Sequence, residues 1–371
     1  MILAEGEPRS EREPQPRVLV EFYGCNHTSI NLQAVPGIIG RLRHLASLSP
    51  GRITVYMESR NFTGTAAERW RKMVQKRGLQ ETIIYSLLVR EGRQPDDEKI
   101  KRRIGQIAAT DISLLAGNGL LPLSELQNYF LAHELDVLGE EYKIEYETES
   151  NSLDTIGRSE KQYDMADSCD DEAHRYWADS DFDRSLEASR RMLIPLLRAS
   201  ELREPDMIND LKRKARTLSR EAKGGVLFII FGNAHFPIVD ILQRKLGNNS
   251  PVNCQTNWAS KENLPNKIVL ESLRNGSPID DETLARYLLI KIITAEIEER
   301  ARKSGDNLSL VAHSFETILT YIGRIVSKMT FAEIRNLCEN KTDVLDFIRS
   351  HSQSGPIKSL MPKVTEDMEG D

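Results

Sequence analysis

Three short apolar segments constrain the fold of this chain more than any other feature. Residues 17–23 read RVLVEFY, residues 52–57 read RITVYM, and residues 225–231 read GVLFIIF. Segments of this length, rich in β-branched and aromatic residues, are typical of buried strands. Helical patterns lie between them, and strands that alternate with helices form parallel sheets. The sequence therefore predicts an α/β fold with a mostly parallel central sheet flanked by helices, a helical insertion and a helical C-terminal region.

The spacing of apolar residues predicts where the helices lie. Leucine, isoleucine and valine recur three or four residues apart over 32–48, which indicates one amphipathic helix. Residues 82–89 fit a strand or a buried helix equally well, and 268–270 are a candidate for a last core strand. Further helices are expected over 63–77, 98–145 with breaks near Gly117 and Pro122, 185–222, 237–246 and much of the chain after 280.

The chain divides by composition as well as by pattern. The acidic, polar stretch 146–186 predicts a long loop or a partly ordered lid. The expected organisation is a disordered tail over 1–16, an α/β catalytic-type domain over 17–260 with a mainly helical insertion over 98–222, a helical C-terminal region over 261–358 and a polar tail over 359–371.

Charge and cysteine content narrow the function classes. The net charge is -6, and this balance argues against a dedicated nucleic-acid binder. No apolar stretch reaches the roughly 20 residues that span a bilayer, and the N-terminal residues lack the apolar core of a signal peptide. The four cysteines are widely separated, which fits free thiols in a reducing cytoplasm. We therefore expect a cytoplasmic protein that acts on a small-molecule or peptide substrate.

Each of the three predicted strands is followed by polar residues of the kinds found in catalytic sites. Ligands in open α/β sheets bind outside the carboxyl ends of the strands. If the three strands are parallel neighbours, these residues meet at one edge of the sheet, and glycines there allow sharp turns. The segments are Gly24-Cys25-Asn26-His27, Glu58-Ser59-Arg60-Asn61 and Gly232-Asn233-Ala234-His235.

Two chemistries are open to this set. His27, Glu58 and His235 form a ligand set that suits Zn, Mn, Fe or Co with open positions for water. Such an ion activates a bound water for attack on a carbonyl. Without an ion, the same three residues can serve as general acid, general base and orienting group. Arg60 is positioned to hold an anion or to stabilise an oxyanion, and Cys25 is a less favoured candidate nucleophile.

These segments also resemble a known superfamily. EFYGCNHTSI, VYMESRNF and FIIFGNAHFPIVDIL look like the three signatures of the TraB/PrgY, ChaN and erythromycin esterase-like superfamily. Its members carry a Gly-x-x-His after the first strand, a Glu followed by an Arg, and a later Gly-x-x-His. The resemblance covers roughly 17–62 and 185–246, and Cys25 and the short spacing from Glu58 to Arg60 depart from the usual pattern.

The resemblance implies a four-stranded α/β core with a helical insertion. It also implies metal-dependent hydrolysis of peptides or esters in some members, and one branch is similar to a haem-binding lipoprotein. Members also tend to carry an Arg in the helix before the last strand. Arg190 or Arg191 is the candidate for this position here.

Two functions from different classes therefore remain. The first is hydrolysis of an ester or amide, with a metal-activated water at His27, Glu58 and His235. The second is binding without turnover, of haem or a peptide in the same pocket, or of a protein partner by the helical C-terminal region.

Overall fold

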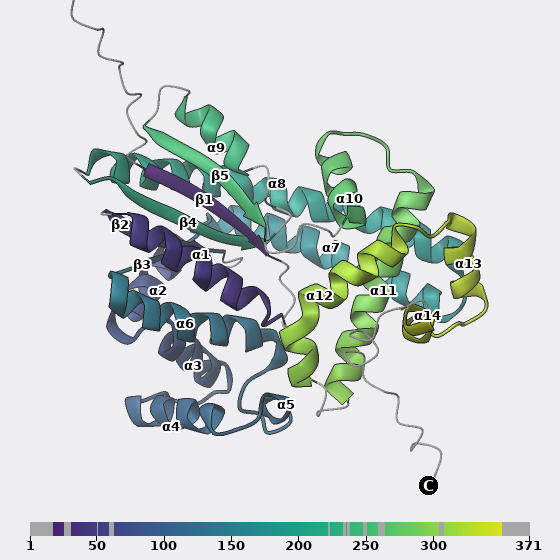
Figure 1. Ribbon diagram of the computed structural model, residues 1–371, viewed down its shortest axis with the longest axis horizontal. Helices are drawn as coiled ribbons and strands as arrows, with labels where there is room; N and C mark the ends of the chain where they lie inside the picture. The colour runs from purple at the N-terminus through teal and green to yellow at the C-terminus, as the bar shows by residue number, and fades with distance from the viewer. Residues whose placement is uncertain are drawn as a thin grey trace, which may run out of the picture.

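The computed structural model places five strands in one sheet, and every neighbouring pair is parallel. The order across the sheet is β3-β2-β4-β1-β5, which confirms the predicted α/β fold with a parallel sheet (Figure 1). The strands are β1 (Val18–Cys25), β2 (Arg52–Met57), β3 (Glu145–Thr148), β4 (Gly225–Gly232) and β5 (Val252–Trp258). The structure describes residues 18–25, 31–49, 51–58, 63–221, 223–232, 235, 238–247, 251–258, 264–303 and 308–350. The expected tails over 1–16 and 359–371 lie outside these residues.

Helices cover both faces of the sheet, and further helices form the C-terminal region (Figure 1). The helices are α1 (Ala34–Leu48), α2 (Gly64–Arg77), α3 (Leu79–Arg90), α4 (Asp97–Ala108), α5 (Ile112–Leu115), a 3-10 turn η1 (Leu123–Glu125), α6 (Leu126–Tyr142), α7 (Leu153–Ala178), α8 (Phe182–Arg220), α9 (Ile238–Leu246), α10 (Leu264–Arg274), α11 (Asp281–Lys303), α12 (Leu308–Val326), α13 (Phe331–Glu339) and α14 (Val344–Ser350). None of these described helices is both long enough and apolar enough to cross a membrane.

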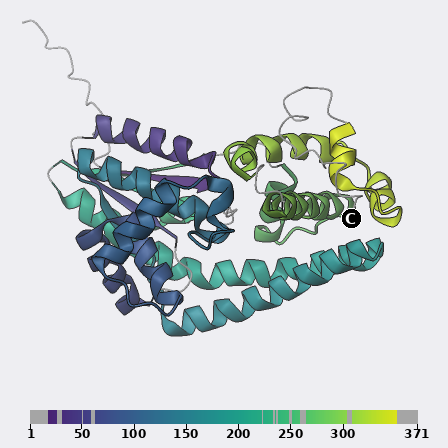
Figure 2. The ribbon, with the colours of Figure 1, turned by 90° about the horizontal axis from the view of Figure 1, so that it is seen from below.

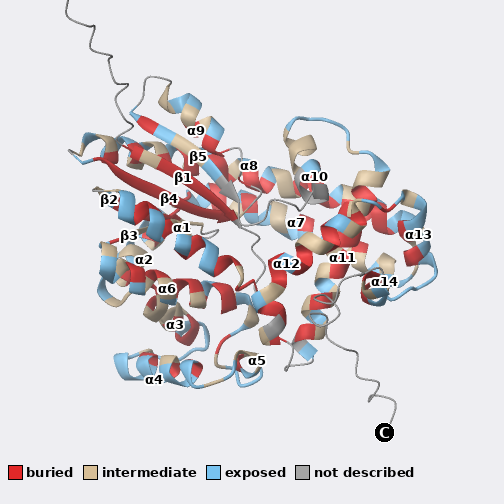
Figure 3. Ribbon diagram, in the orientation of Figure 1, coloured by how far each residue is buried: buried red, intermediate tan, exposed pale blue. Residues whose placement is uncertain are grey.

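Alternation along the strands explains how the sheet is buried on both sides. Successive side chains of a strand point to opposite faces. Val18, Val20 and Phe22 of β1 pack against α8 and α9. Leu19 and Tyr23 pack against the opposite layer, in which α1 and α6 lie. The sheet is therefore the middle layer of three, and the central strand β4 is buried over nearly its whole length (Figure 3).

The helices that follow the neighbouring strands β1 and β4 lie on opposite faces of the sheet, which makes this pair a topological switch point. β4 lies between β2 and β1 in the sheet. The chain leaves β1 toward α1 and leaves β4 toward α9, and these helices lie on opposite faces. Crevices that bind ligands in open α/β sheets lie at such switch points, outside the carboxyl ends of the strands. The ends of β1, β2 and β4 are therefore adjacent at the switch point, as predicted from their polar residues.

One predicted strand is wrong, and two strands of the sheet were not predicted. Residues 268–270 lie in α10, where Ile268 is exposed and Val269 is buried, as on the two sides of an amphipathic helix. The remaining strands are β3 and β5, which both lie at sheet edges and carry polar residues, so neither shows an apolar run. The sheet thus has one strand more than the resemblance implies. The ambiguous segment 82–89 belongs to a helix, α3.

The predicted loop over 146–186 is also wrong. Its first residues belong to β3, and most of the remainder forms the 26-residue helix α7, which packs along α8 (Figure 2). Ser152 caps the helix by accepting from the N–H of Thr155. The buried face of α7 includes the small residues Ala166 and Ala173. Small residues allow close helix packing without a run of apolar residues. The acidic sequence therefore lacks the apolar periodicity from which a helix is predicted.

The C-terminal helices share a core with the insertion and do not form a separate unit. Apolar residues of α11 to α14 pack in one cluster with residues of α3, α7 and α8. Figure 2 shows the α7–α8 pair extending from beneath the sheet to beneath the C-terminal helices. Asn31, just before α1, donates to Glu316 of α12 at 2.7 Å. The C-terminal region therefore supports the segment between β1 and α1.

An ion pair between β1 and α1 gives a test of this packing. Glu21 of β1 is fully buried, and Arg41 of α1 donates to both of its carboxylate oxygens at 2.6 Å. We expect Arg41→Ala to lower the free energy of unfolding by about 3 kcal/mol, because it leaves a buried carboxylate without its charge partner. Urea denaturation followed by circular dichroism measures this change. Arg43→Ala, at an exposed position of the same helix, is the control, and equal midpoints for the two variants would contradict the account.

Candidate functional site

Arg203 organises the charged groups at the carboxyl edge of the sheet. Its side chain is fully buried, and it donates to Glu149 through Nε at 3.0 Å and through Nη2 at 2.6 Å. Its Nη1 donates to Glu58 Oε1 at 3.1 Å and contacts the hydroxyl of Tyr163 at 3.0 Å. Burial alone lowers the pKa of Arg203, but the charges of Glu149 and Glu58 outweigh it and raise the pKa. The guanidinium therefore stays charged and joins two carboxylates that follow neighbouring strands.

The strand ends supply those two carboxylates. Glu58 is the first residue after β2, and its N–H donates to the carbonyl of Ile230 in β4 at 3.3 Å. Glu149 is the first residue after β3, and its N–H donates to the carbonyl of Met57 at 3.2 Å. The backbone N–H of Gly232 donates to Glu58 Oε2 at 3.0 Å. Both oxygens of Glu58 therefore accept a hydrogen bond, and backbone contacts fix both acidic residues in register with the sheet.

His235 lies between two carboxylates. Its Nε2 is 3.4 Å from Glu58 Oε1, and its Nδ1 is 3.5 Å from Glu204 Oε1. Both distances are longer than a normal hydrogen bond, so we describe these contacts as ion pairs. Burial alone lowers the pKa of His235, but Glu58 and Glu204 outweigh it and raise the pKa to about 9. The ring is therefore an imidazolium at neutral pH.

The C-terminal region completes this cluster. Arg274, the last residue of α10, donates to Glu204 Oε2 through Nη1 at 2.8 Å, and its Nη2 contacts Oε1. Burial alone raises the pKa of Glu204, but His235 and Arg274 outweigh it and hold the pKa below its ordinary value. Residues after 260 therefore contribute directly to the strand-end site.

Among the described residues of the cluster, the charges balance when His235 is protonated. Glu58, Glu149 and Glu204 supply three negative charges, and Arg203 and Arg274 supply two positive ones. The imidazolium of His235 supplies the third positive charge. Buried charges are costly unless paired, which favours this balanced state.

The predicted site residues fall into three groups. Glu58, Gly232 and His235 come together in the cluster, and Gly24 and Cys25 end β1 beside β4, where Cys25 pairs with Gly232. Arg190 lies elsewhere, where it is partly exposed and contacts Asp281 and Glu187. The remaining predicted residues lie outside the described residues, namely Asn26, His27, Arg60, Asn61 and Asn233.

The arginine of α8 that reaches the site is Arg203, and Arg190 and Arg191 were the wrong choices for this position. Arg190 and Arg191 lie about three turns from Arg203 and pair with carboxylates at the surface. A signal for Arg203 was present in the sequence, because it occupies a helical stripe with Ala199, Met207 and Leu211. An arginine in an otherwise apolar stripe indicates a buried partner. The sequence around Glu149 has no comparable pattern, because the short strand β3 before it is polar.

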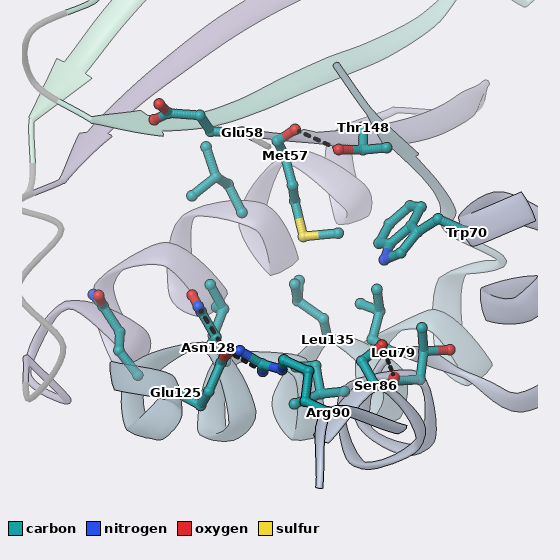
Figure 4. A pocket seen from close by; sticks show the side chains of 16 residues that line it. Met57, Glu58, Trp70, Leu79, Ser86, Arg90, Glu125, Asn128, Leu135 and Thr148 are labelled. Atoms are coloured by element: carbon teal, nitrogen blue, oxygen red, sulfur yellow. Dashed lines mark hydrogen bonds and ion pairs between the residues drawn. The ribbon is translucent and has the colours of Figure 1, made fainter. Parts of the chain in front are cut away.

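Two cavities reach the cluster from different sides. One, of about 340 Å³, has Glu58 in its wall and is otherwise lined by residues of the sheet and of α2, α3, η1 and α6 (Figure 4). The other, of about 670 Å³, reaches Glu204 and Arg274 and is lined largely by charged residues of α8, α9 and α10. Most residues that line the second cavity are charged, whereas Glu58, Arg90 and Glu125 are the charged residues that line the first.

The fit to a divalent ion depends on the state of Glu58 and His235. Both oxygens of Glu58 accept hydrogen bonds, and an imidazolium has no lone pair for a metal. Among the described residues, no group of three or more His, Cys, Asp or Glu side chains is arranged to hold an ion. His27, the third expected ligand, lies outside them. The expected metal site at His27, Glu58 and His235 therefore stays a prediction.

No family model, curated protein or solved structure matches the chain.

The raised pKa of His235 predicts a specific pH dependence of stability. The pKa is about 9 in the folded protein and 6.5 in a model peptide, so the folded state holds the proton more tightly. The contribution, about 3 kcal/mol, is fully present below pH 6.5 and is lost as the pH rises through about 9. We expect the free energy of unfolding of the wild type to exceed that of His235→Gln at pH 6 and the difference to shrink by pH 10.

Urea titrations of both proteins across this range measure the difference directly. His133→Gln, at an exposed position, is the control and should follow the wild type at every pH. A difference between wild type and His235→Gln that stays constant from pH 6 to pH 10 would show that His235 does not titrate as described.

Proposed function

We propose that the protein hydrolyses an ester or amide bond at the carboxyl edge of its sheet. The observation that carries this proposal is the buried ring of His235, held between Glu58 and Glu204 beside a cavity that reaches Glu58. Strongly shifted histidines in such positions are candidates for acid–base catalysis. The proposal also draws on the resemblance to the TraB/PrgY, ChaN and erythromycin esterase-like superfamily, which implies hydrolysis in some members.

The proposed roles follow from the charges and contacts. His235 is a charged donor whose Nε2 proton is not committed to a short hydrogen bond, so it can donate to the carbonyl oxygen or to the leaving group. Glu58 keeps the ring charged and orients it. Its own position is fixed by Arg203 and by the N–H of Gly232.

His27 is the remaining candidate for the general base. It follows the end of β1 by two residues, and β1 is the direct neighbour of β4. In the proposed reaction, the oxygen of water attacks the carbonyl carbon while His27 takes a proton from that water. The bond to the leaving group then breaks, and His235 supplies the proton that the leaving group needs. Arg60 stays a candidate for a second contact to the oxyanion.

Removal of the proposed acid gives the first test. We expect His235→Gln to lower kcat for a soluble p-nitrophenyl ester by about 100-fold or more, because the variant cannot donate a proton. His133→Gln controls for the loss of a surface histidine. Circular dichroism at pH 8 reports whether each variant is folded. Full activity in a folded His235→Gln protein would refute the proposed role.

A second experiment distinguishes this acid–base mechanism from attack by a metal-activated water. The untagged protein is dialysed against a chelator, and its content of Zn, Mn, Fe and Co is measured beside that of His235→Gln. Activity that survives dialysis supports the acid–base route. Activity lost on dialysis and restored by one of these ions, with stoichiometric metal that is absent from the variant, would establish the metal-dependent route through His27, Glu58 and His235.

A further inference from the structure

The cavity beside Glu58 has a lining that distinguishes it from the rest of the site. Figure 4 shows Met57, Glu58 and Thr148 on the sheet side, Trp70 at one end, and Leu79, Leu135 and Arg90 on the helical side. Most of its wall is apolar, formed by Met57, Trp70, Leu79, Ile83, Leu131 and Leu135. Glu58 is the one member of the charged cluster among the described residues that line it.

Gln127 supplies a second, independent feature of this cavity. It is the second residue of α6 and is only 5% exposed. Its Nε2 is buried and has no hydrogen-bond partner among the described residues. A buried N–H without a partner is costly, by about 1–3 kcal/mol, so such a group in a cavity wall favours a ligand with an acceptor oxygen.

We propose that this cavity binds the apolar part of the substrate, with Gln127 Nε2 donating to a carbonyl oxygen of the same molecule. The proposal rests on the hydrolase function and adds the substrate class, an ester or amide of a medium-length alkyl or aromatic acid. The cavity beside Glu204 is lined largely by charged residues, and covering these charges with an apolar group would be costly.

The volume sets the size of this apolar part. An apolar cavity of roughly 150 Å³ holds benzene. The cavity beside Glu58 is about 340 Å³, slightly more than twice that volume. It therefore suits a ligand of roughly twelve non-hydrogen atoms, such as an eight- to ten-carbon acyl chain with its carbonyl group.

The rim of the cavity indicates where a ligand enters. Arg90 of α3 donates to Glu125 Oε1 at 2.7 Å, and Asn128 of α6 donates to Glu125 Oε2 at 3.4 Å. These three polar residues lie across the cavity from the sheet (Figure 4), and the side chain of Arg90 is largely exposed. A chain that enters beside them extends over apolar side chains toward Glu58.

Binding of 2-decanone tests the cavity without requiring turnover, because a ketone carries the carbonyl but has no bond to hydrolyse. Isothermal titration calorimetry should show binding to the wild type with a negative heat-capacity change, the mark of buried apolar surface. We expect Ser86→Phe, which fills the cavity from α3, to abolish binding. We expect Gln127→Leu to weaken it by about fivefold.

The controls are Val89→Phe, at an exposed position of α3, and Gln106→Leu, at an exposed position of α4. Both should bind 2-decanone like the wild type. Absence of binding to the wild type, or equal binding by folded Ser86→Phe, would overturn the assignment of this cavity. An unchanged Kd in Gln127→Leu would overturn the role of Gln127.

A series of p-nitrophenyl esters from acetate to decanoate then tests the link to hydrolysis. We expect kcat/KM to rise with acyl length up to about ten carbons in the wild type and not in Ser86→Phe. Binding of 2-decanone without hydrolysis of any ester would refute the hydrolase function and leave the cavity assignment standing. Hydrolysis that does not depend on acyl length would refute the cavity as the substrate site and leave the hydrolase function standing.

Discussion

A single buried arginine holds the strand-end site together. Arg203 joins Glu58 after β2 to Glu149 after β3. Removing one partner of a buried ion pair typically costs about 3–5 kcal/mol, because the remaining charge stays desolvated. The helix that carries Arg203 also covers one face of the sheet through Met207, Ile208 and Leu211. The packing of α8 on the sheet therefore also fixes the position of Arg203 in the site.

The same helix links the sheet to the C-terminal region. Arg203 and Glu204 are consecutive, and consecutive residues of a helix point about 100° apart. Arg203 thus faces the ends of β2 and β3, while Glu204 faces His235 and Arg274. Arg274 comes from α10, and α12 contacts the segment just before α1. The C-terminal helices are in this way part of the site, and they also share an apolar core with the insertion.

Much of this arrangement was predictable from the sequence where the signal was local. The apolar strands β1, β2 and β4 and the polar residues after them placed Glu58 and His235 at one edge, because parallel strands end on the same side. Glu149 was not predictable in this way, since the short polar strand β3 has no apolar pattern. Arg274 was equally hidden, because its partner Glu204 is distant in sequence and only the packing of α10 on α8 brings them together.

The loop predicted over 146–186 is wrong for a similar physical reason. Its helix buries mainly small or polar side chains such as Ala166, Ala173 and Ser159, so hydropathy alone does not distinguish it from a loop. Arg203 was within reach of sequence analysis, since its helical stripe is otherwise apolar or small. The resemblance implies only that an arginine lies in the helix, and the residues predicted from it, Arg190 and Arg191, pair with carboxylates at the surface.

The most direct test of the central claim is the pKa of His235 itself. Nuclear magnetic resonance of ring-labelled histidine, in the wild type and in Glu204→Gln, measures it at equilibrium. The balanced charge cluster predicts a pKa near 9 in the wild type and a lower value in Glu204→Gln, because the variant removes one of the two carboxylates beside the ring. A wild-type pKa at or below 6.5, unchanged in Glu204→Gln, would contradict the buried imidazolium and the acid–base role that depends on it.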